Sequence, residues 1–229
     1  VCIMLYKPAV DSDFSPKAAV KTVCYKVKNI VDNPNYFRPS GVTCFCGQQG
    51  SGKTYSAIVY VYRLMTAFPA CVLVTNMDLY GLFDKFKGRI FPYEGLYSLT
   101  NMNNGPNGII YLIDELQLEF NSLESKNMPI SLFTEICQQR KQRKHIVGTS
   151  QLYARLAKPF REQMDVVVAC KCYFGVLQRN YVLDGWTLFQ EENKLSGECL
   201  RRYWLVHRPE FYESFDTYAK MNRKRGEAR

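Results

Sequence analysis

Short hydrophobic runs, separated by polar stretches, predict the strands of a buried sheet. They are rich in Val, Ile and Cys, and each is too short to form a long helix. Continuous apolar runs of this kind are typical of parallel strands that are covered on both faces. The runs lie at residues 42–46, 70–76, 109–113, 145–149 and 166–174.

The segments between these runs predict helices that cover the sheet. We expect helices at 55–66 and 130–142, a shorter one at 94–102 and a basic helical stretch at 152–163. From 178 to 206 the pattern instead alternates polar and apolar residues around two turn dipeptides, Asp184-Gly185 and Ser196-Gly197, which predicts antiparallel hairpins. A short aromatic helix at 210–221 and a basic tail at 222–226 complete an α/β fold.

The first forty residues have no place in this sheet. Ser15 and Pro16 precede a basic segment, 17–30, and predict a helix with Ser15 as its N-cap and Pro16 in its first turn. The turn-rich segment 32–36 separates this helix from the first strand. We interpret the region as a peripheral strap, and an arm that docks on a neighbouring subunit is the alternative.

Charge adds a partner class to this picture. The chain has 30 Lys and Arg against 21 Asp and Glu, a net charge of +9, which favours nucleic acid or an anionic membrane face. Charge alone does not choose between them. No run approaches the ~18 apolar residues of a membrane span, and the N-terminus lacks the pattern of a signal peptide.

The nine cysteines favour reduced thiols over disulfides or zinc. Cys44 and Cys46, and likewise Cys170 and Cys172, form C-x-C pairs within apolar runs, which places each pair on one face of a strand. Zinc sites use C-x₂-C pairs instead. We therefore expect reduced core cysteines and a cytoplasmic location.

A phosphate-binding loop occupies residues 47–54, which fit the pattern G-x-x-x-x-G-K-[ST] between a strand and a helix. Backbone N–H groups of such a loop surround a phosphate, and the helix adds the positive end of its dipole. Lys53 is expected to reach the β- and γ-phosphates of ATP, and the Thr54 hydroxyl to bind Mg²⁺. The predicted nucleotide-binding residues are Gly47, Gln48, Gln49, Gly50, Ser51, Gly52, Lys53, Thr54 and Tyr55.

Two acids follow the third hydrophobic run directly. The carboxyl end of a buried parallel strand is where an α/β sheet places ligand chemistry. Asp114 has the position of a second Mg²⁺ residue, acting through water, and Glu115 the position of a carboxylate that polarises the attacking water. Kinases of small molecules do not need the second acid, so Glu115 favours hydrolysis.

Gln151 ends the fourth run and is predicted to lie beside the γ-phosphate, assisted by Thr149 or Ser150. This requires its strand to lie between those of Cys46 and Asp114. The alternative is that these residues only cap the next helix. Arg140 and Arg143 precede the same strand, and one of them is a candidate arginine finger in a neighbour's site.

The alternative for Arg140 and Arg143 is a solvated helix end, and Arg161 carries the same ambiguity. Basic residues also supply candidate phosphate contacts for nucleic acid, with an aromatic residue to stack on bases. These candidates are 140–144, Arg155, Lys158, the basic tail and Tyr153.

The ordered set of phosphate loop, acidic strand, basic helix end and strand ending in Gln151 resembles the FtsK–HerA superfamily of P-loop ATPases. The segments 143–151, 158–163 and 212–218 look like the zonular occludens toxin (Zot)-like family, which is similar to the morphogenesis ATPases of filamentous phages. The resemblance covers roughly residues 41–221.

The resemblance implies an additional-strand fold with strand order 5-1-4-3-2. It implies a ring of subunits, such as a hexamer, that drives single-stranded DNA through a phage assembly machine, with phage proteins and the inner membrane as further partners. Lys53, Thr54, Asp114, Glu115 and Gln151 carry over. Family members commonly add a membrane span, so this chain is either a soluble fragment at the cytoplasmic face or a complete soluble ATPase.

These considerations predict three regions, a 1–40 arm, a 41–177 ATPase core and a 178–229 extension. The expected function is hydrolysis of Mg-ATP coupled to DNA translocation in virion assembly. Two other interpretations stay open. One is an ATP-binding switch or adaptor with little turnover, and the other is a small-molecule kinase.

Overall fold

The computed structural model describes residues 15–122, 130–191 and 194–216. Contacts divide the chain into two units, Val1–Pro34 and Asn35–Arg229, and each is described by itself. Among the described residues, none of the helices has the length and apolar content that crossing a membrane requires.

The first unit contains helix α1 (Pro16–Asp32). The Ser15 hydroxyl accepts a hydrogen bond from the Ala18 N–H at 3.3 Å, and Pro16 lies in the first turn. This confirms the predicted helix and its cap. The role of the segment, strap or arm, stays a prediction.

The second unit is built on one eight-stranded sheet, ordered β10-β7-β6-β1-β5-β4-β2-β3. Neighbouring strands are parallel, except that β7 is antiparallel to both β6 and β10. The strands are β1 (Gly41–Cys46), β2 (Val72–Thr75), β3 (Ile90–Pro92), β4 (Ile109–Ile113), β5 (Lys144–Ser150), β6 (Met164–Tyr173), β7 (Leu177–Asp184) and β10 (Cys199–Val206).

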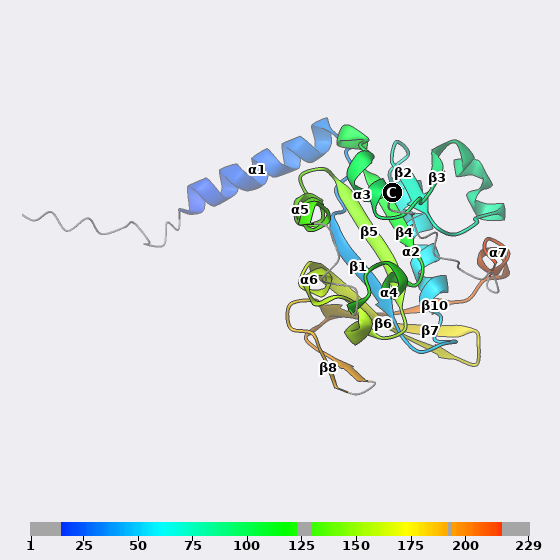
Figure 1. Ribbon diagram of the computed structural model, residues 1–229. Helices are drawn as coiled ribbons and strands as arrows, with labels where there is room; N and C mark the ends of the chain where they lie inside the picture. Colours follow the sequence, from blue (N-terminus) through cyan, green and yellow to red (C-terminus); the bar gives the residue numbers. More distant parts are fainter. Residues whose placement is uncertain (1–14, 123–129, 192–193, 217–229) are drawn as a thin grey trace, which may run out of the picture. The chain divides into compact units, whose positions relative to one another are not determined.

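The strand order confirms the predicted arrangement, because β6-β1-β5-β4-β2 is 5-1-4-3-2 in chain order of the five expected strands. In Figure 1, β1, β5 and β4 run side by side. Cys46 pairs with Ser150, and Ile113 with Gly148, so the carboxyl ends of these three strands meet at one edge. The edge strand β3 was not predicted.

Helices cover both faces of the sheet, as expected. On one face, α2 (Lys53–Ala67) packs Ile58 and Met65 against a buried cluster that includes Phe45 and Leu112. On the other face, Phe120 and Phe160 stack at 3.9 Å within a second cluster. The other α-helices are α3 (Tyr97–Asn101), α4 (Leu116–Glu119), α5 (Ile130–Gln138), α6 (Lys158–Arg161) and α7 (Pro209–Tyr212), and the 3₁₀ helices are Gly81–Arg89, Gly105–Asn107 and Tyr153–Arg155.

The helices predicted at 94–102, 152–163 and 130–142 are shorter than expected, and the first of them is α3, Tyr97–Asn101. The stretch 152–163 is broken into a 3₁₀ turn and α6, because the Ala157 N–H donates to the Phe120 carbonyl at 2.8 Å and leaves the helical path. The prediction 130–142 was also too long. Helix α5 ends at Gln138, and turns then lead to Arg143, whose φ of 54° is left-handed.

The C-terminal extension is antiparallel, as predicted, but its turns lie elsewhere. Strand β7 pairs with β6 and β10, while β8 (Phe189–Glu191) pairs with β9 (Lys194–Ser196) in a separate two-stranded sheet. Asp184 is the last residue of β7 and Ser196 the last residue of β9, and neither dipeptide forms a two-residue hairpin turn. The aromatic helix predicted at 210–221 was too long, because α7 ends at Tyr212 and the described residues 213–216 are not helical. Its positions beyond 216 lie outside the described residues, as does the basic tail.

The described cysteines are free thiols. Cys44 and Cys46 share one face of β1, with their sulfur atoms 3.4 Å apart, as the C-x-C spacing predicted. Cys170 is also buried, and burial raises the pKa of its thiol well above the usual range.

Candidate nucleotide site

The loop between β1 and α2 is fastened to the sheet and to itself. The Gly47 N–H donates to the Ser150 carbonyl of β5 at 3.2 Å, and the Ser51 N–H donates to the Gln48 carbonyl at 3.1 Å. A Cβ on Gly47 would lie 2.3 Å from the Ser51 hydroxyl, so the tight curl needs glycine there.

Gly52 begins α2 in a left-handed conformation, with φ of 76°. A side chain is excluded twice at this position. The conformation disfavours other residues, and a Cβ would lie 2.0 Å from the side-chain oxygen of Gln178. Two of the fixed glycines of the motif thus have direct structural causes.

Lys53 is 8% exposed at the positive end of α2. Its ammonium lies 3.6 Å from a carboxylate oxygen of Glu115. The loop lysine and the second acid of the acidic pair therefore face each other, although sixty-two positions separate them in the chain.

Asp114 lies beside the hydroxyl groups of two threonines. Thr54 donates to its Oδ1 atom at 3.2 Å, and Thr149 donates to the same atom. Burial raises the pKa of Asp114 above its usual value, while the hydrogen bond from Thr149 opposes that effect. A hydroxyl and a carboxylate oxygen side by side fit a hard cation such as Mg²⁺.

Glu115 has a left-handed backbone, with φ of 55° and ψ of 56°, which is uncommon outside glycine. Its N–H donates to the Thr149 hydroxyl at 2.9 Å. Because this hydroxyl also donates to Asp114, a single residue of β5 positions both acids.

The Glu115 carboxylate is contacted by two amides besides Lys53. Gln151 donates to its Oε1 atom at 3.3 Å, and Gln117 donates to the other oxygen. Gln151 therefore lies where the strand order predicted, at the end of β5 between β1 and β4, next to the residues expected to surround the γ-phosphate.

Asn76, at the end of β2, was missed from the sequence. Its side chain accepts from the Asp114 N–H at 2.9 Å and donates to the Asp114 carbonyl at 3.1 Å, which fixes the backbone of the acidic pair. The signal was present, because Asn76 is a polar residue directly after a buried parallel strand.

Two buried amides of β7 were missed as well. Gln178 donates to the Ser51 carbonyl at 2.9 Å and to Asn180, which in turn donates to the Ser56 hydroxyl at 3.0 Å. Both amides are fully buried. The C-terminal extension thus holds the phosphate loop and the first turn of α2 through side chains.

Tyr55 faces the extension as well. Its ring stacks on His207 at 3.9 Å between centroids, and its hydroxyl accepts from the Arg208 N–H at 2.8 Å. Protein contacts therefore occupy the ring, and a contribution of the Tyr55 backbone to nucleotide binding stays a prediction. The side-chain roles of Gln48 and Gln49, which are exposed, stay predictions.

The predicted arginines lie at the other edge of the sheet, where β5 begins. Arg143 donates to the Phe37 carbonyl at 3.1 Å, and its guanidinium lies 4.6 Å from the Tyr36 ring centroid. Arg140 is exposed. One chain therefore does not bring Arg140 or Arg143 to Lys53, and a role in a neighbour's site stays a prediction.

Tyr153 was proposed to stack on bases, and this is wrong. The residue is 5% exposed, inside the core cluster of Phe120 and Phe160, so its ring is not accessible to a nucleic acid. Arg161 lies with its guanidinium 5.4 Å from the Tyr153 ring centroid, which gives this arginine a packing contact within the chain.

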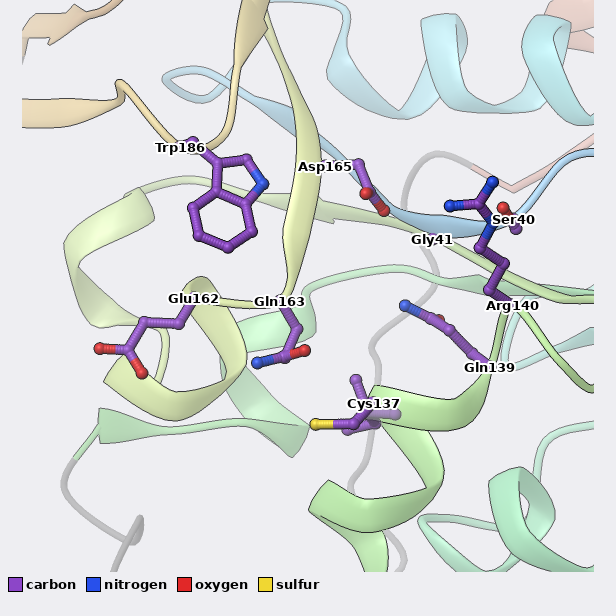
Figure 2. Close-up of a pocket in the computed structure, with 10 residues that line it drawn as sticks. Ser40, Gly41, Cys137, Gln139, Arg140, Glu162, Gln163, Asp165 and Trp186 are labelled. Carbon is purple, nitrogen blue, oxygen red and sulfur yellow. The ribbon is translucent and has the colours of Figure 1, made fainter. Parts of the chain in front are cut away.

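A polar pocket of about 190 Å³ lies at the amino edge, and the phosphate loop does not contribute to its lining. Figure 2 shows Trp186 on one side of this pocket and Arg140 and Gln139 on the other, with Asp165 above and Cys137 below. Asp165 accepts from the Val42 N–H at 3.0 Å, and burial raises the pKa of its carboxyl.

No protein-family description matches this chain, and no curated protein is similar to it in sequence. Solved structures do share its fold. The N-terminal domain of zonular occludens toxin from Neisseria meningitidis has a TM-score of 0.51 at 12% identity, covering 78% of this chain and all of that one.

Two structures of a viral packaging NTPase share the fold as well. The genome packaging NTPase B204 from Sulfolobus turreted icosahedral virus 2, in complex with ATP-gammaS, has a TM-score of 0.50 at 10% identity, covering 69% of this chain and 96% of that one. The same NTPase in complex with sulfate has a TM-score of 0.51 at 11% identity, covering 74% and 99%. The chain therefore has the P-loop NTPase fold.

Proposed function

We propose that this chain is a P-loop ATPase that hydrolyses Mg-ATP and couples hydrolysis to the movement of DNA in virion assembly, in packaging or in extrusion. The observation that carries this proposal is the convergence of four side chains at the carboxyl edge of the sheet. They are Lys53, Asp114, Glu115 and Gln151. The fold shared with a packaging NTPase that binds ATP-gammaS supports ATP as the nucleotide.

Lys53 exchanges its partner when the nucleotide binds. In the structure its ammonium faces Glu115 at 3.6 Å. A γ-phosphate carries more charge than one carboxylate and draws the ammonium to itself, which frees Glu115 to orient and deprotonate a water molecule. Gln151, which already donates a hydrogen bond to Glu115, then lies beside the γ-phosphate and responds to its presence.

Thr54 and Asp114 are the residues that would hold Mg²⁺. When bound, the ion neutralises charge on the β- and γ-phosphate oxygens. Thr149 keeps Asp114 and Glu115 in fixed relative positions, and Asn76 fixes the backbone between them. This arrangement is preorganised, so it costs little rearrangement during the reaction.

The partners follow from the resemblance of the sequence and stay part of the proposal. They are other copies of the chain in a ring, such as a hexamer, single-stranded DNA, phage assembly proteins and the inner membrane of the host. The proposed location is the host cytoplasm, at the cytoplasmic face of that membrane. The net charge of +9 supports a polyanionic partner.

The second candidate is an ATP-binding switch or adaptor with little turnover. The observation that favours it is the engagement of Glu115 by three side chains, Lys53, Gln117 and Gln151, which occupies the carboxylate that hydrolysis needs. If nucleotide binding does not release Glu115, the chain binds ATP without consuming it.

Steady-state ATP hydrolysis with and without single-stranded DNA separates the two candidates. The proposal predicts hydrolysis that rises with DNA and falls about 100- to 10,000-fold in Glu115→Gln, with ATP binding retained. Glu94→Gln, a change at an exposed glutamate outside the site, is the matched control and keeps the wild-type rate. ATP binding without DNA-dependent turnover, and with no effect of Glu115→Gln, would establish the switch instead.

A further inference from the structure

Strands β6, β7 and β10 carry a set of basic and aromatic side chains on one face of the sheet. Pairing brings them together, because Arg179 lies opposite both Lys171 and Trp204, and Tyr181 lies opposite Arg202. We name this set the arginine–aromatic face. Its members are Lys171, Tyr173, Arg179, Tyr181, Arg202 and Trp204.

The cations of this face lie over its rings. The Arg179 guanidinium is 4.8 Å from the Tyr181 ring centroid and 5.0 Å from that of Trp204. Arg202 also lies over Tyr181, at 5.8 Å. A guanidinium stacked on a ring keeps its planar set of N–H donors for a phosphate.

The third cation extends this pattern to β6. The Lys171 ammonium is 5.1 Å from the Tyr173 ring centroid, and the Tyr173 and Trp204 centroids are 6.0 Å apart. Each of the three neighbouring strands therefore carries one positive charge and one ring on this face. Trp204 is 52% exposed, and Lys171 and Arg202 are exposed too, so the face is open to a ligand.

The parts of β6, β7 and β10 that carry this face contain no acidic residue, although Asp165 and Asp184 lie at the far ends of β6 and β7. The stretches 169–173, 177–181 and 202–206 contain neither Asp nor Glu. In the part of the chain that the structure describes, none of the ion pairs involves Lys171, Arg179 or Arg202. The face thus presents uncompensated positive charge beside exposed rings.

We propose that the arginine–aromatic face binds single-stranded nucleic acid, with its bases stacked on the rings and its phosphates on the cations. Unpaired bases expose the π-faces that aromatic side chains bind, whereas a duplex hides them. Cations that lie beside the rings can contact the phosphates of the same strand whose bases stack. The inference deepens the proposed function and rests on it for its biological context, since it gives the DNA partner a site.

Strand β7 links this face to the phosphate loop. Gln178 and Asn180 point toward α2 and hold Ser51 and Ser56, while Arg179, between them in the chain, belongs to the arginine–aromatic face. One strand is thus shared by both sites. A shift of β7 on binding nucleic acid is transmitted to the Ser51 carbonyl, which gives the ATPase a direct route of stimulation.

The chain has only two tryptophans, and they provide a matched test. Trp204 belongs to the face, and Trp186, 83% exposed, lies outside it. We would titrate full-length Trp186→Phe and Trp204→Phe with oligo(dT) and follow tryptophan fluorescence. Stacking predicts strong quenching in Trp186→Phe, where Trp204 remains, and none in Trp204→Phe. Equal quenching in the two variants would overturn the proposal.

Affinity for oligo(dT) gives a second readout that does not depend on fluorescence. Trp204→Ala is expected to weaken binding about 5- to 100-fold, and Trp186→Ala to leave it unchanged. Arg202→Ala is expected to reduce the slope of log K against log salt by about 0.7, while the exposed Lys87→Ala does not change it. Unchanged affinity in Trp204→Ala and Arg202→Ala would contradict the inference.

Additional binding measurements test whether the arginine–aromatic face binds something other than single-stranded DNA. Oligo(rU) shows whether the sugar matters, and duplex DNA that binds as well as oligo(dT) would contradict stacking. If Trp204→Ala alters the oligomeric state but not the affinity for oligo(dT), the face is a contact between copies and the proposal is wrong.

The outcomes also separate this inference from the proposed function. Quenching of Trp204 in a protein without DNA-dependent hydrolysis would rule out the DNA-translocating ATPase and support nucleic-acid binding at the arginine–aromatic face. DNA-stimulated hydrolysis that is unchanged in Trp204→Ala would support the DNA-translocating ATPase and rule out the arginine–aromatic face as its DNA site.

Discussion

At the carboxyl edge of the parallel strands, Lys53 and Glu115 face each other through a 3.6 Å contact beside the predicted phosphate loop. At the amino edge, Lys144 is enclosed instead. It donates to the Leu99 carbonyl at 2.7 Å and pairs with Glu135. Both lysines are buried, but the contact of Lys53 is with a side chain, whereas Lys144 also donates to a backbone carbonyl.

The same contrast holds for the other charged groups of the amino edge. Arg143 donates to the Phe37 carbonyl, and Asp165 accepts from the Val42 N–H. Backbone partners of this kind are permanent features of the fold. The partners of Glu115 at the carboxyl edge are instead side chains, as the proposed transfer of Lys53 to a phosphate requires.

Lys53→Ala tests the carboxyl edge of the sheet and has the largest expected effect of the substitutions in this comparison. Loss of the ammonium that meets the phosphates is expected to lower ATP hydrolysis about 100- to 1000-fold. Thermal unfolding should change little, because the ammonium meets Glu115 only through a long contact of 3.6 Å. A variant that unfolds early but hydrolyses ATP normally when folded would reverse the assignment.

Lys144→Met tests the amino edge of the sheet, where the lysine is held by a backbone carbonyl and by Glu135. Removing one member of a buried pair leaves Glu135 and the Leu99 carbonyl without the ammonium, and we expect the free energy of unfolding to fall by about 3 kcal/mol. Denaturant titration measures this. The rate of hydrolysis per folded molecule should stay at the wild-type value, and a large loss would show that the amino edge takes part in the chemistry.

The two histidines allow the amino edge to be tested through the pH dependence of the free energy of unfolding. Burial lowers the pKa of His145, at the amino edge, to about 4. The unfolded chain, with a histidine pKa near 6.5, therefore binds the proton first, and stability is lost as the pH falls from about 6.5 to 4, by about 3 kcal/mol.

His145→Asn should flatten the pH dependence of unfolding between about pH 6.5 and 5. His207→Asn is the matched control. Burial lowers the pKa of His207 too, but this residue is less enclosed, so its substitution should change the slope less. Equal slopes in the wild type and His145→Asn would show that His145 does not carry the effect.

Thr149→Val removes the hydroxyl that joins Asp114 to the Glu115 backbone while keeping the shape of the side chain. Each lost hydrogen bond to a buried group costs about 1–3 kcal/mol, and we expect hydrolysis to fall about 10- to 100-fold. Steady-state kinetics measures this against Thr66→Val, an exposed threonine of α2. Similar rates in the two variants would contradict the positioning role.

The arginines have the smallest expected effects within one chain. Arg143→Ala should cost about 1 kcal/mol of stability, through the bond to Phe37. If Arg140 acts in a neighbour's site, Arg140→Ala and Glu115→Gln should each be inactive and regain activity when mixed, because mixed rings contain intact sites. Activity in Arg140→Ala alone would exclude it as the finger.

The strand order followed from the resemblance to P-loop ATPases, whereas the positions of the polar residues at the carboxyl edge followed from local signals. A buried run followed by a polar residue marks the carboxyl edge wherever it occurs, which located Asp114 and Gln151 and would have located Asn76. Arg143 precedes a parallel strand, and by the same logic it belongs to the opposite edge.

The remaining features depend on contacts between distant parts of the chain. The break before α6 follows from a bond between Ala157 and the Phe120 carbonyl, which periodicity does not reveal. Gln178 meets the phosphate loop across 127 positions, through the register of an antiparallel strand. Local pattern predicts that β7 exists, but not which of its residues face the loop.

The alternation along β7 also limits how this protein can change over evolutionary time. Gln178 and Arg179 are neighbours in the chain and serve opposite faces. Insertion or deletion of one residue upstream in this strand would exchange the two sets of side chains. Substitutions can tune either face separately, but a change in strand length would damage both at once, so we expect homologues to vary in the residues of this strand and not in its length.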